Sequence, residues 1–280
     1  MQIFDPNKVI EDGYQITYSS PTGDLYLLHS HDRRANRHRR VALEPDGWSG
    51  GFAIPEFTEK ETANRYGARR DGSKLPPFEG SLSVAVRAGD RPLAFTRRDF
   101  TRAWSSYEEG KLTVVAREGN NAWTPVVLTS ISEPPHETAR RRTQRMQIGY
   151  RALKGVWFGK SRTYTGSAEV RDNSDSGLSP VVSLEWDTTQ DLDVTFPDGR
   201  RITFPRSTAT GSLPPIVYFD LEPGMMGHPT DAPDGDTVFT LWPAFQGKMR
   251  GVELTPRKPS YWTLSGCTLR VTPRYLHPWR

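Results

Sequence analysis

Apolar and polar residues alternate with a period of two along most of this 280-residue chain, and no other feature limits its fold as strongly. In the first such run, Tyr14, Ile16 and Tyr18 alternate with Gln15 and Thr17. Successive side chains of a strand point to opposite faces, so each run buries one face. We expect further strands at residues 24–29, 81–87, 111–117, 145–151, 182–186, 192–196, 202–204, 216–221, 237–242, 252–255, 261–264 and 268–272. The sequence therefore predicts a mainly β protein.

One segment has helical spacing instead. Its apolar residues follow the i, i+3, i+4, i+7 pattern of one helix face, at Phe100, Ala103, Trp104 and Tyr107. Thr96 and Asp99 have the spacing of a capping box, and Gly110 is a plausible stop. We expect a helix at about 96–109, and a second, weaker one at 58–66.

The chain divides near residues 155–166 (GVWFGKSRTYTG). Residues 1–159 hold 24 Lys and Arg against 19 Asp and Glu, whereas residues 160–280 hold 13 against 14. Strands surround a helix in the first part, and the second part is expected to contain strands alone. We predict an N-terminal β-sandwich with one α-helix over 1–159 and a C-terminal β-sandwich of jelly-roll type over 160–280.

The sequence offers little catalytic or metal chemistry. It lacks a nucleophile elbow, a Walker A loop and a G-x-G-x-x-G turn after a strand. Its one cysteine, Cys267, excludes a disulfide within the chain and a zinc site built on thiolates. His29, His31 and His38 form a possible metal set, but neighbouring arginines oppose a cation there. We predict no enzymatic activity, no catalytic residue, no cofactor and no metal.

The most unusual stretch is HSHDRRANRHRR, at residues 29–40. Clustered arginines bind carboxylates as readily as phosphates, so nucleic acid, a metal and a protein partner all remain open as ligands. Tryptophans in loops rich in glycine or asparagine (PDGWSGG and NNAWTP) are further contact candidates. The interface candidates are Arg33, Arg34, Arg37, Arg39, Arg40, Arg140, Arg141, Arg142, Trp48 and Trp123.

The order of these features resembles the distal tail proteins (minor tail proteins) of long non-contractile-tailed bacteriophages, especially those of actinobacteria. The predicted helix leads directly into the strand at 111–117, followed by TPVVLTSI and RRTQRMQIGYRAL. An all-β domain follows, and it ends in LRVTPRYLHPWR. The resemblance covers most of the chain and includes no diagnostic motif.

The resemblance implies a structural role. Distal tail proteins form a hexameric ring that joins the tail tube to the baseplate hub around the DNA channel. The N-terminal domain forms the ring, and the C-terminal domain is often galectin-like or like a carbohydrate module. The implied partners are the protein itself, the tail tube protein, the tape measure protein, and the baseplate hub and other minor tail proteins. The implied location is the virion tail tip, assembled in the host cytoplasm, with no membrane association and no tight DNA binding.

Two other functions stay open. The aromatic-rich second domain is compatible with a carbohydrate-binding, lectin-like module that recognises the host surface, which glycan binding by residues 160–280 would reveal. The arginine clusters are compatible with nucleic-acid binding, which would weaken steeply as salt rises. Within the tail-tip interpretation, the arginines of 29–40 face either acidic groups of an adjacent protomer or neighbouring tail protein, or solvent at the channel wall. We favour the protein interface as a hypothesis.

Overall fold

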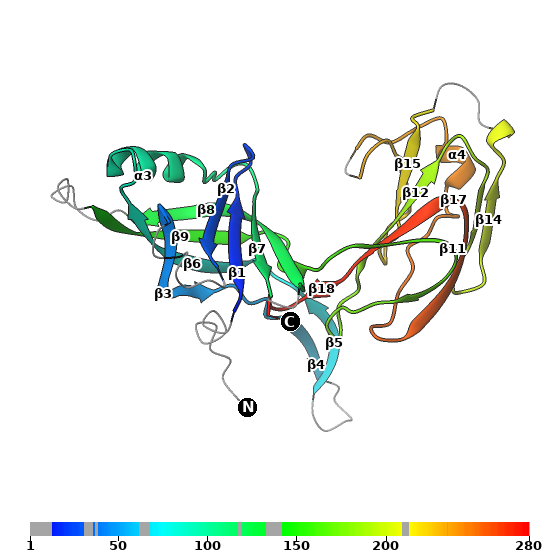
Figure 1. Cartoon of the computed structure of the whole chain (residues 1–280). Helices are drawn as coiled ribbons and strands as arrows, with labels where there is room; N and C mark the ends of the chain where they lie inside the picture. Colours follow the sequence, from blue (N-terminus) through cyan, green and yellow to red (C-terminus); the bar gives the residue numbers. More distant parts are fainter. Residues whose placement is uncertain are drawn as a thin grey trace. The chain divides into compact units, whose positions relative to one another are not determined.

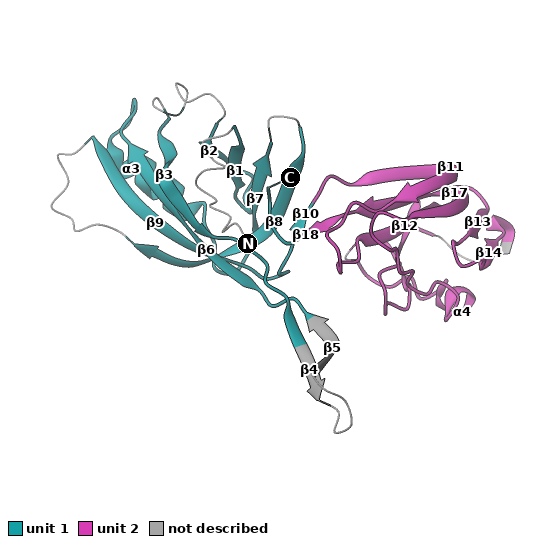
Figure 2. Cartoon of the chain, turned by 90° about the horizontal axis from the view of Figure 1, so that it is seen from below, with its two compact units in different colours: residues 1–158, 276–280 teal, residues 159–275 magenta. Residues whose placement is uncertain are grey.

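The computed structural model describes residues 13–30, 36, 39–61, 68–116, 119–132, 142–208, 213–233 and 235–279. The fold is mainly β with antiparallel sheets, which confirms the prediction from the alternating pattern (Figure 1). The chain forms two compact units (Figure 2). The first contains Met1–Phe158 and Leu276–Arg280, and the second contains Gly159–Tyr275. The second unit is therefore inserted into the sequence of the first.

The elements of the first unit are β1 (Gln15–Ser19), β2 (Leu25–His29), β3 (Val41–Gly50), β4 (Glu56–Glu61), β5 (Ala68–Lys74), β6 (Phe78–Arg87), α3 (Leu93–Arg102), β7 (Gly110–Val115), β8 (Asn121–Ser132), β9 (Thr143–Ala152) and β10 (Trp157–Phe158). Those of the second unit are β11 (Arg162–Arg171), β12 (Val181–Asp187), β13 (Leu192–Thr195), β14 (Arg201–Phe204), the 3-10 helix η2 (Arg206–Thr208), β15 (Ile216–Asp220), β16 (Pro229–Thr230), α4 (Trp242–Phe245), β17 (Pro259–Thr272) and β18 (Arg274–Tyr275).

One antiparallel sheet dominates the first unit, with the strand order β2-β1-β7-β8-β9-β6-β3. Alternate residues of β1, β8 and β9 are buried, as expected for strands with one face against the core. The sheet curls so that β2 and β3, at the two ends of this order, approach each other. The strands β4 and β5 form a separate hairpin, so the weak helix predicted at 58–66 is wrong at its start, and residues 62–67 lie outside the described ones.

Helix α3 begins earlier than predicted, because Pro92 and not Thr96 precedes its first turn. Pro92 is the N-cap residue, and no side chain caps the helix by a hydrogen bond. The predicted capping box is therefore wrong. Three of the four residues predicted on the buried face are buried: Phe100 and Ala103, and Trp104, whose ring lies just beyond the helix and stacks on Tyr18 at 3.7 Å.

The helix also ends earlier than predicted, at Arg102 and not near Glu109. The Ser105 hydroxyl oxygen accepts hydrogen bonds from the backbone N–H groups of Tyr107 (3.1 Å) and Glu108 (3.0 Å). Such a serine turn competes with helical hydrogen bonding. The side chain of Tyr107 is 98% exposed, so it is not part of the buried face.

An aromatic cluster forms part of the first unit's core. The ring of Trp48 lies 6.1 Å from that of Trp157 and 5.4 Å from that of Trp279. Residues 276–279 are held there by a backbone bond from the Ala53 N–H to the Leu276 oxygen (2.8 Å). No pattern in the sequence indicated that this segment would complete the core of the first unit.

In the second unit, β17 is the central strand and pairs with β11, β12 and β13. We predicted two strands here, but β17 runs without a break through Gly266, which adopts a left-handed conformation (φ +68°) between the residues that pair with β12 and those that pair with β13. The strand predicted at 237–242 is wrong: Thr237 makes an isolated bridge, and α4 begins at Trp242. The segment 252–255 is not a strand either, although Val252 and Leu254 are buried.

Candidate functional site

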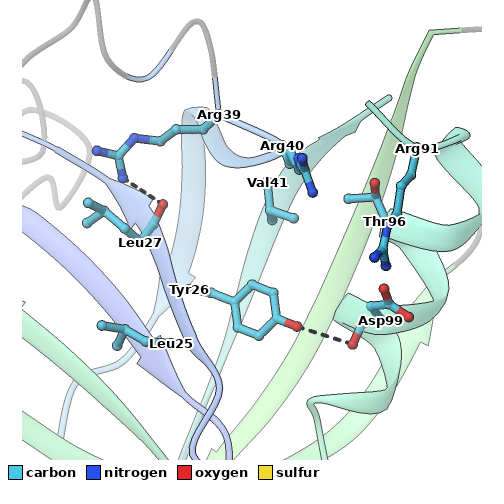
Figure 3. A pocket seen from close by; sticks show the side chains of 9 residues that line it. All are labelled: Leu25, Tyr26, Leu27, Arg39, Arg40, Val41, Arg91, Thr96 and Asp99. Carbon is cyan, nitrogen blue, oxygen red and sulfur yellow. Dashed lines mark hydrogen bonds between the residues drawn. The ribbon is translucent and has the colours of Figure 1, made fainter. Parts of the chain in front are cut away.

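A pocket lies between the edge strands β2 and β3, beside α3 (Figure 3). We call it the seam pocket, and its volume is about 720 Å³. Its lining is Leu25, Tyr26, Leu27, Arg39, Arg40, Val41, Arg91, Thr96 and Asp99. Aliphatic and aromatic side chains come from the two strands, and the three arginines add positive charge. The pocket therefore combines apolar surface with groups that bind carboxylates.

Arg39 bridges the open edge of β2. Its Nη1 donates a hydrogen bond to the Leu27 oxygen at 2.8 Å (Figure 3). On its other side β2 pairs with β1, so this bond occupies a backbone acceptor of an edge strand. An occupied edge is less prone to unwanted pairing with other chains. Arg39 therefore has a structural role within the chain.

The Asn36 amide organises the same stretch. Its Oδ1 accepts from the Ser30 N–H at 2.9 Å, and its Nδ2 donates to the Ser30 oxygen at 3.1 Å. Arg87 of β6 holds the segment from the other side, because its Nη1 donates to the Asn36 oxygen (2.9 Å) and to the Arg39 oxygen (3.2 Å). The described part of 29–40 is thus held by hydrogen bonds between side chains and the backbone.

Arg40 and Arg91 remain the accessible cations of the seam pocket. Arg40 pairs with Asp90 at 2.6 Å, but these side chains are 52% and 92% exposed, and such surface pairs contribute little to stability. Among the described residues, Arg91 has no hydrogen bond or ion pair. These two guanidinium groups are therefore available to a carboxylate of another chain.

Tyr26 and Asp99 close the side of the pocket next to α3. The Tyr26 hydroxyl donates to the backbone oxygen of Asp99 at 3.3 Å, and its ring packs on Phe100 at 5.1 Å. Burial raises the pKa of Tyr26, and the charges of Asp24 and Asp99 raise it further. The hydroxyl therefore stays protonated at neutral pH and acts as a donor. The lining has no nucleophile paired with a base, so its chemistry suits binding.

The other predicted contact residues are scattered. Arg33, Arg34, Arg37, Arg140 and Arg141 lie outside the described residues. Arg142 is exposed at the start of β9, where its backbone oxygen accepts from the Ala88 N–H at 2.9 Å. The described residues bring Arg39 and Arg40 together in the seam pocket, and Arg142 is not part of its lining.

Both tryptophans predicted in loops are in strands. Trp48 belongs to β3 and is 2% exposed, so it offers no surface to a partner and its assignment as an interface residue is wrong for this chain. Trp123 belongs to β8 and is half-buried, with Lys111 Nζ 4.3 Å from its ring centroid. The glycines around Trp48 suggested a loop. In the structure, Gly50 and Gly51 turn the chain only at the end of β3 (φ +77° and +84°), and Trp48 precedes this turn within the strand.

Other site chemistry is scarce in the described part of the chain. It contains no group of three or more His, Cys, Asp or Glu side chains placed to hold a metal ion. Cys267 is buried, and burial raises the pKa of its thiol to about 12, so it is a core residue and not a nucleophile. None of the described helices has the length and apolarity needed to cross a bilayer.

Sequence reasoning missed Arg91, Tyr26 and Asp99 as partners of Arg39 and Arg40. These residues come from β2, α3 and the turn before it, more than 50 positions apart at the extremes. The curl of the sheet brings these residues together, and no local sequence motif predicts that curl.

Comparison with solved structures assigns the fold. The Dit (gp 19.1) protein of phage SPP1, described as a paradigm of the hub adsorption apparatus in phages infecting Gram-positive bacteria, matches with a TM-score of 0.56. Sequence identity is 12%, and the match covers 94% of this chain and 99% of that chain. This chain has the fold of a phage hub protein. The phage P2 baseplate in its activated conformation with Ca matches with a TM-score of 0.52 and 8% identity, over 93% of this chain and 98% of that chain.

The same phage P2 baseplate with Sr gives a TM-score of 0.52 and 8% identity over 92% and 97% of the two chains. No protein-family model and no curated protein matches this sequence. The likeness to phage hub proteins therefore lies in the fold, and it extends over both units.

Proposed function

We propose that this protein is a structural component of a phage tail tip. It acts as a distal tail protein that assembles into a hexameric ring, joins the tail tube to the baseplate hub and surrounds the DNA channel. The carrying observation is the match to SPP1 Dit over 94% of this chain and 99% of that chain, because it includes both units. The proposal assigns no catalytic activity, cofactor or metal to the protein.

The proposed partners are further copies of the chain, the tail tube protein, the tape measure protein and the hub or other minor tail proteins. A ring requires two different complementary patches on each protomer. The seam pocket supplies one such patch, since Arg40 and Arg91 lie beside the apolar side chain of Leu25, which is 68% exposed. We propose that this patch binds an acidic surface of the next protomer. We also propose that the protein is located in the virion and is a distal tail protein of the actinobacteriophage type.

The test is the oligomeric state of the purified chain, alone and with a tail tube protein. Light scattering coupled to size exclusion should give about six times the mass of one chain, and electron micrographs should show rings. A chain that stays monomeric at high concentration, and also in the presence of the tail tube protein, would contradict the proposal.

The alternative is a carbohydrate-binding module in the second unit. Trp186 and Trp262 are buried there, as expected for core residues, whereas Tyr261 is 65% exposed on β17. An exposed tyrosine can stack on a sugar ring. Glycan binding by the full chain that is lost in Tyr261→Ala would favour this alternative, and a blank glycan array would exclude it.

A further inference from the structure

The second unit carries a group of four cations that is separate in sequence from the lining of the seam pocket. A pocket of about 570 Å³ is lined by side chains of the β13–β14 hairpin and of the turn after α4. We call it the basic pocket. Its lining includes the cations Arg200, Arg201, Lys248 and Arg250 and the hydroxyl-bearing Thr203.

Two of these cations are held in fixed positions. Arg200 Nε pairs with Asp198 at 2.6 Å, and its guanidinium carbon lies 4.7 Å from the ring centroid of Phe196. Its terminal nitrogens donate to the backbone oxygens of Lys248 (3.2 Å) and Arg250 (3.4 Å). Arg200 therefore ties the turn after α4 to the hairpin.

Arg201 forms a two-bond pair with Asp193, with Nε–Oδ1 at 2.9 Å and Nη2–Oδ2 at 2.6 Å. This geometry fixes the plane of its guanidinium. The side chain is nevertheless 64% exposed, so it still contributes positive charge at the rim.

The other two cations are not neutralised. Arg250 Nε donates to the Gly247 oxygen at 3.1 Å, which orients the side chain and leaves both terminal nitrogens available. No carboxylate of the described residues forms an ion pair with Lys248 or Arg250, and both side chains are exposed. Because only Asp193 and Asp198 offset four cations, the pocket keeps a net positive charge.

We propose that the basic pocket binds a tetrahedral oxyanion, a phosphate or sulfate group that is either free or carried on a sugar, and not the phosphodiester backbone of a nucleic acid. Arginine presents a fork of N–H donors to such oxygens, and lysine adds a point charge. Sequence-tolerant binding of single-stranded nucleic acid relies on exposed aromatic platforms. Phe196 is 2% exposed beneath Arg200, so the pocket offers no such platform. A compact anion therefore fits better than a nucleic-acid strand.

The test uses the full chain at low ionic strength, with binding measured by calorimetry. The probes are inorganic phosphate, a heparin-derived tetrasaccharide and a single-stranded DNA oligonucleotide. The site variant is Lys248→Ala with Arg250→Ala. The control is Lys160→Ala with Lys258→Ala, which removes the same charge from exposed positions of the same unit.

We expect phosphate or the sulfated sugar to bind, and the site variant to lose about tenfold or more in affinity, because it loses charge-assisted hydrogen bonds. The control should bind like the unaltered chain. Binding of phosphate alone would indicate a free anion as the ligand, and tighter binding of the tetrasaccharide would indicate a carried one.

Three results would overturn the proposal: neither phosphate nor the sulfated sugar binds, both variants weaken equally, or DNA binds more tightly than both anions through the same two residues. This outcome is independent of ring formation, since the basic pocket is contained within the second unit of a single chain.

Discussion

At the residue scale, Trp48 joins sequence-distant parts of the first unit. Its ring contacts Trp157, and it also contacts Trp279 from the segment that returns after the second unit. Trp48 is 2% exposed and packed against two other indoles. These neighbours are closely packed themselves, so they cannot move in to fill the cavity that removal of Trp48 would leave.

We therefore expect Trp48→Ala to destabilise the first unit by about 3–5 kcal/mol, the usual cost of removing a large buried aromatic side chain. Chemical denaturation followed by tryptophan fluorescence measures this loss. Tyr107→Ala is the control, because Tyr107 is 98% exposed and its removal should change stability little. Similar stability of Trp48→Ala and the unaltered chain would contradict the packing described here.

Asp172 gives the second unit a pH dependence. The residue is 1% exposed; its Oδ1 accepts from the Ser174 N–H and hydroxyl, and its Oδ2 has no hydrogen-bond partner among the described residues. Burial raises the pKa of this carboxyl above its ordinary value, and the bonds from Ser174 partly oppose the shift. The folded state therefore binds the proton more tightly than the unfolded state, and ionisation of Asp172 opposes folding at neutral pH.

We expect Asp172→Asn to raise the melting temperature at pH 7, with the difference shrinking as the pH falls through the raised pKa toward 3.8. Calorimetric melting at several pH values checks this. Asp187→Asn should show the opposite sign, because hydrogen bonds from Thr189 lower the pKa of Asp187. That variant should lose stability at pH 7 and lose less in acid. The prediction fails if Asp172→Asn is as stable as the unaltered chain at every pH.

At the element scale, the course of β17 depends on Gly266. An added Cβ at this position would overlap the backbone oxygen of Asp191, and the residue has φ +68°. Gly166 of β11 has nearly the same conformation (φ +67°), but an added Cβ there meets nothing within 4 Å. Substituting each glycine by alanine therefore distinguishes the cost of backbone strain, which both positions share, from the cost of steric overlap, which only Gly266 has.

We expect Gly166→Ala to cost about 1–2 kcal/mol, the price of a left-handed conformation for a residue with a Cβ. Gly266→Ala should cost clearly more, because the strand must also move away from Asp191. Urea denaturation of the two variants measures the difference. Equal losses would show that the neighbouring backbone adjusts freely.

The alternating pattern of apolar and polar residues predicted β1, β6, β9 and β12, but we did not predict β8, although alternate residues of its first half are also buried. It failed at 237–242, because the burial of Leu241 depends on the turn into α4 and not on a ladder. Phe100 and Trp104 were predicted correctly as buried, but Tyr107 and both helix ends were not, because Pro92 precedes the first turn and the Ser105 hydroxyl forms a turn after the last. The seam pocket was half predicted: Arg39 and Arg40 were chosen from a local cluster, and Arg91 joins them only through the curl of the sheet.

At the scale of the whole molecule, the arginines of 29–40 fall into two groups. Arg39 has a backbone partner within the chain, the Leu27 oxygen, whereas the ion pair of Arg40 with Asp90 is exposed and leaves Arg40 accessible to a neighbouring subunit. Arg33, Arg34 and Arg37 lie outside the described residues, and we assign them to the contact between subunits.

We expect serine at Arg33, Arg34 and Arg37 to impair ring assembly with an unchanged melting temperature. Serine at Arg39 should lower the melting temperature by a few degrees, because the bond to the Leu27 oxygen is lost and about 1 kcal/mol corresponds to roughly 2–4 °C in a domain of this size. Size exclusion and thermal melting of both variants separate the effects. Intact rings from the first variant would remove these arginines from the proposed interface.

The inserted arrangement of the second unit has a consequence for biosynthesis. The Gly159 N–H donates to the Pro273 oxygen at 2.8 Å, so the two ends of this unit lie side by side. A ribosome releases the segment carrying Trp279 only after the whole second unit has been made. The tryptophan cluster of the first unit therefore stays incomplete until Trp279 has been synthesised. Because its two ends are adjacent, we also expect that the second unit can be replaced by another domain without rearranging the first unit.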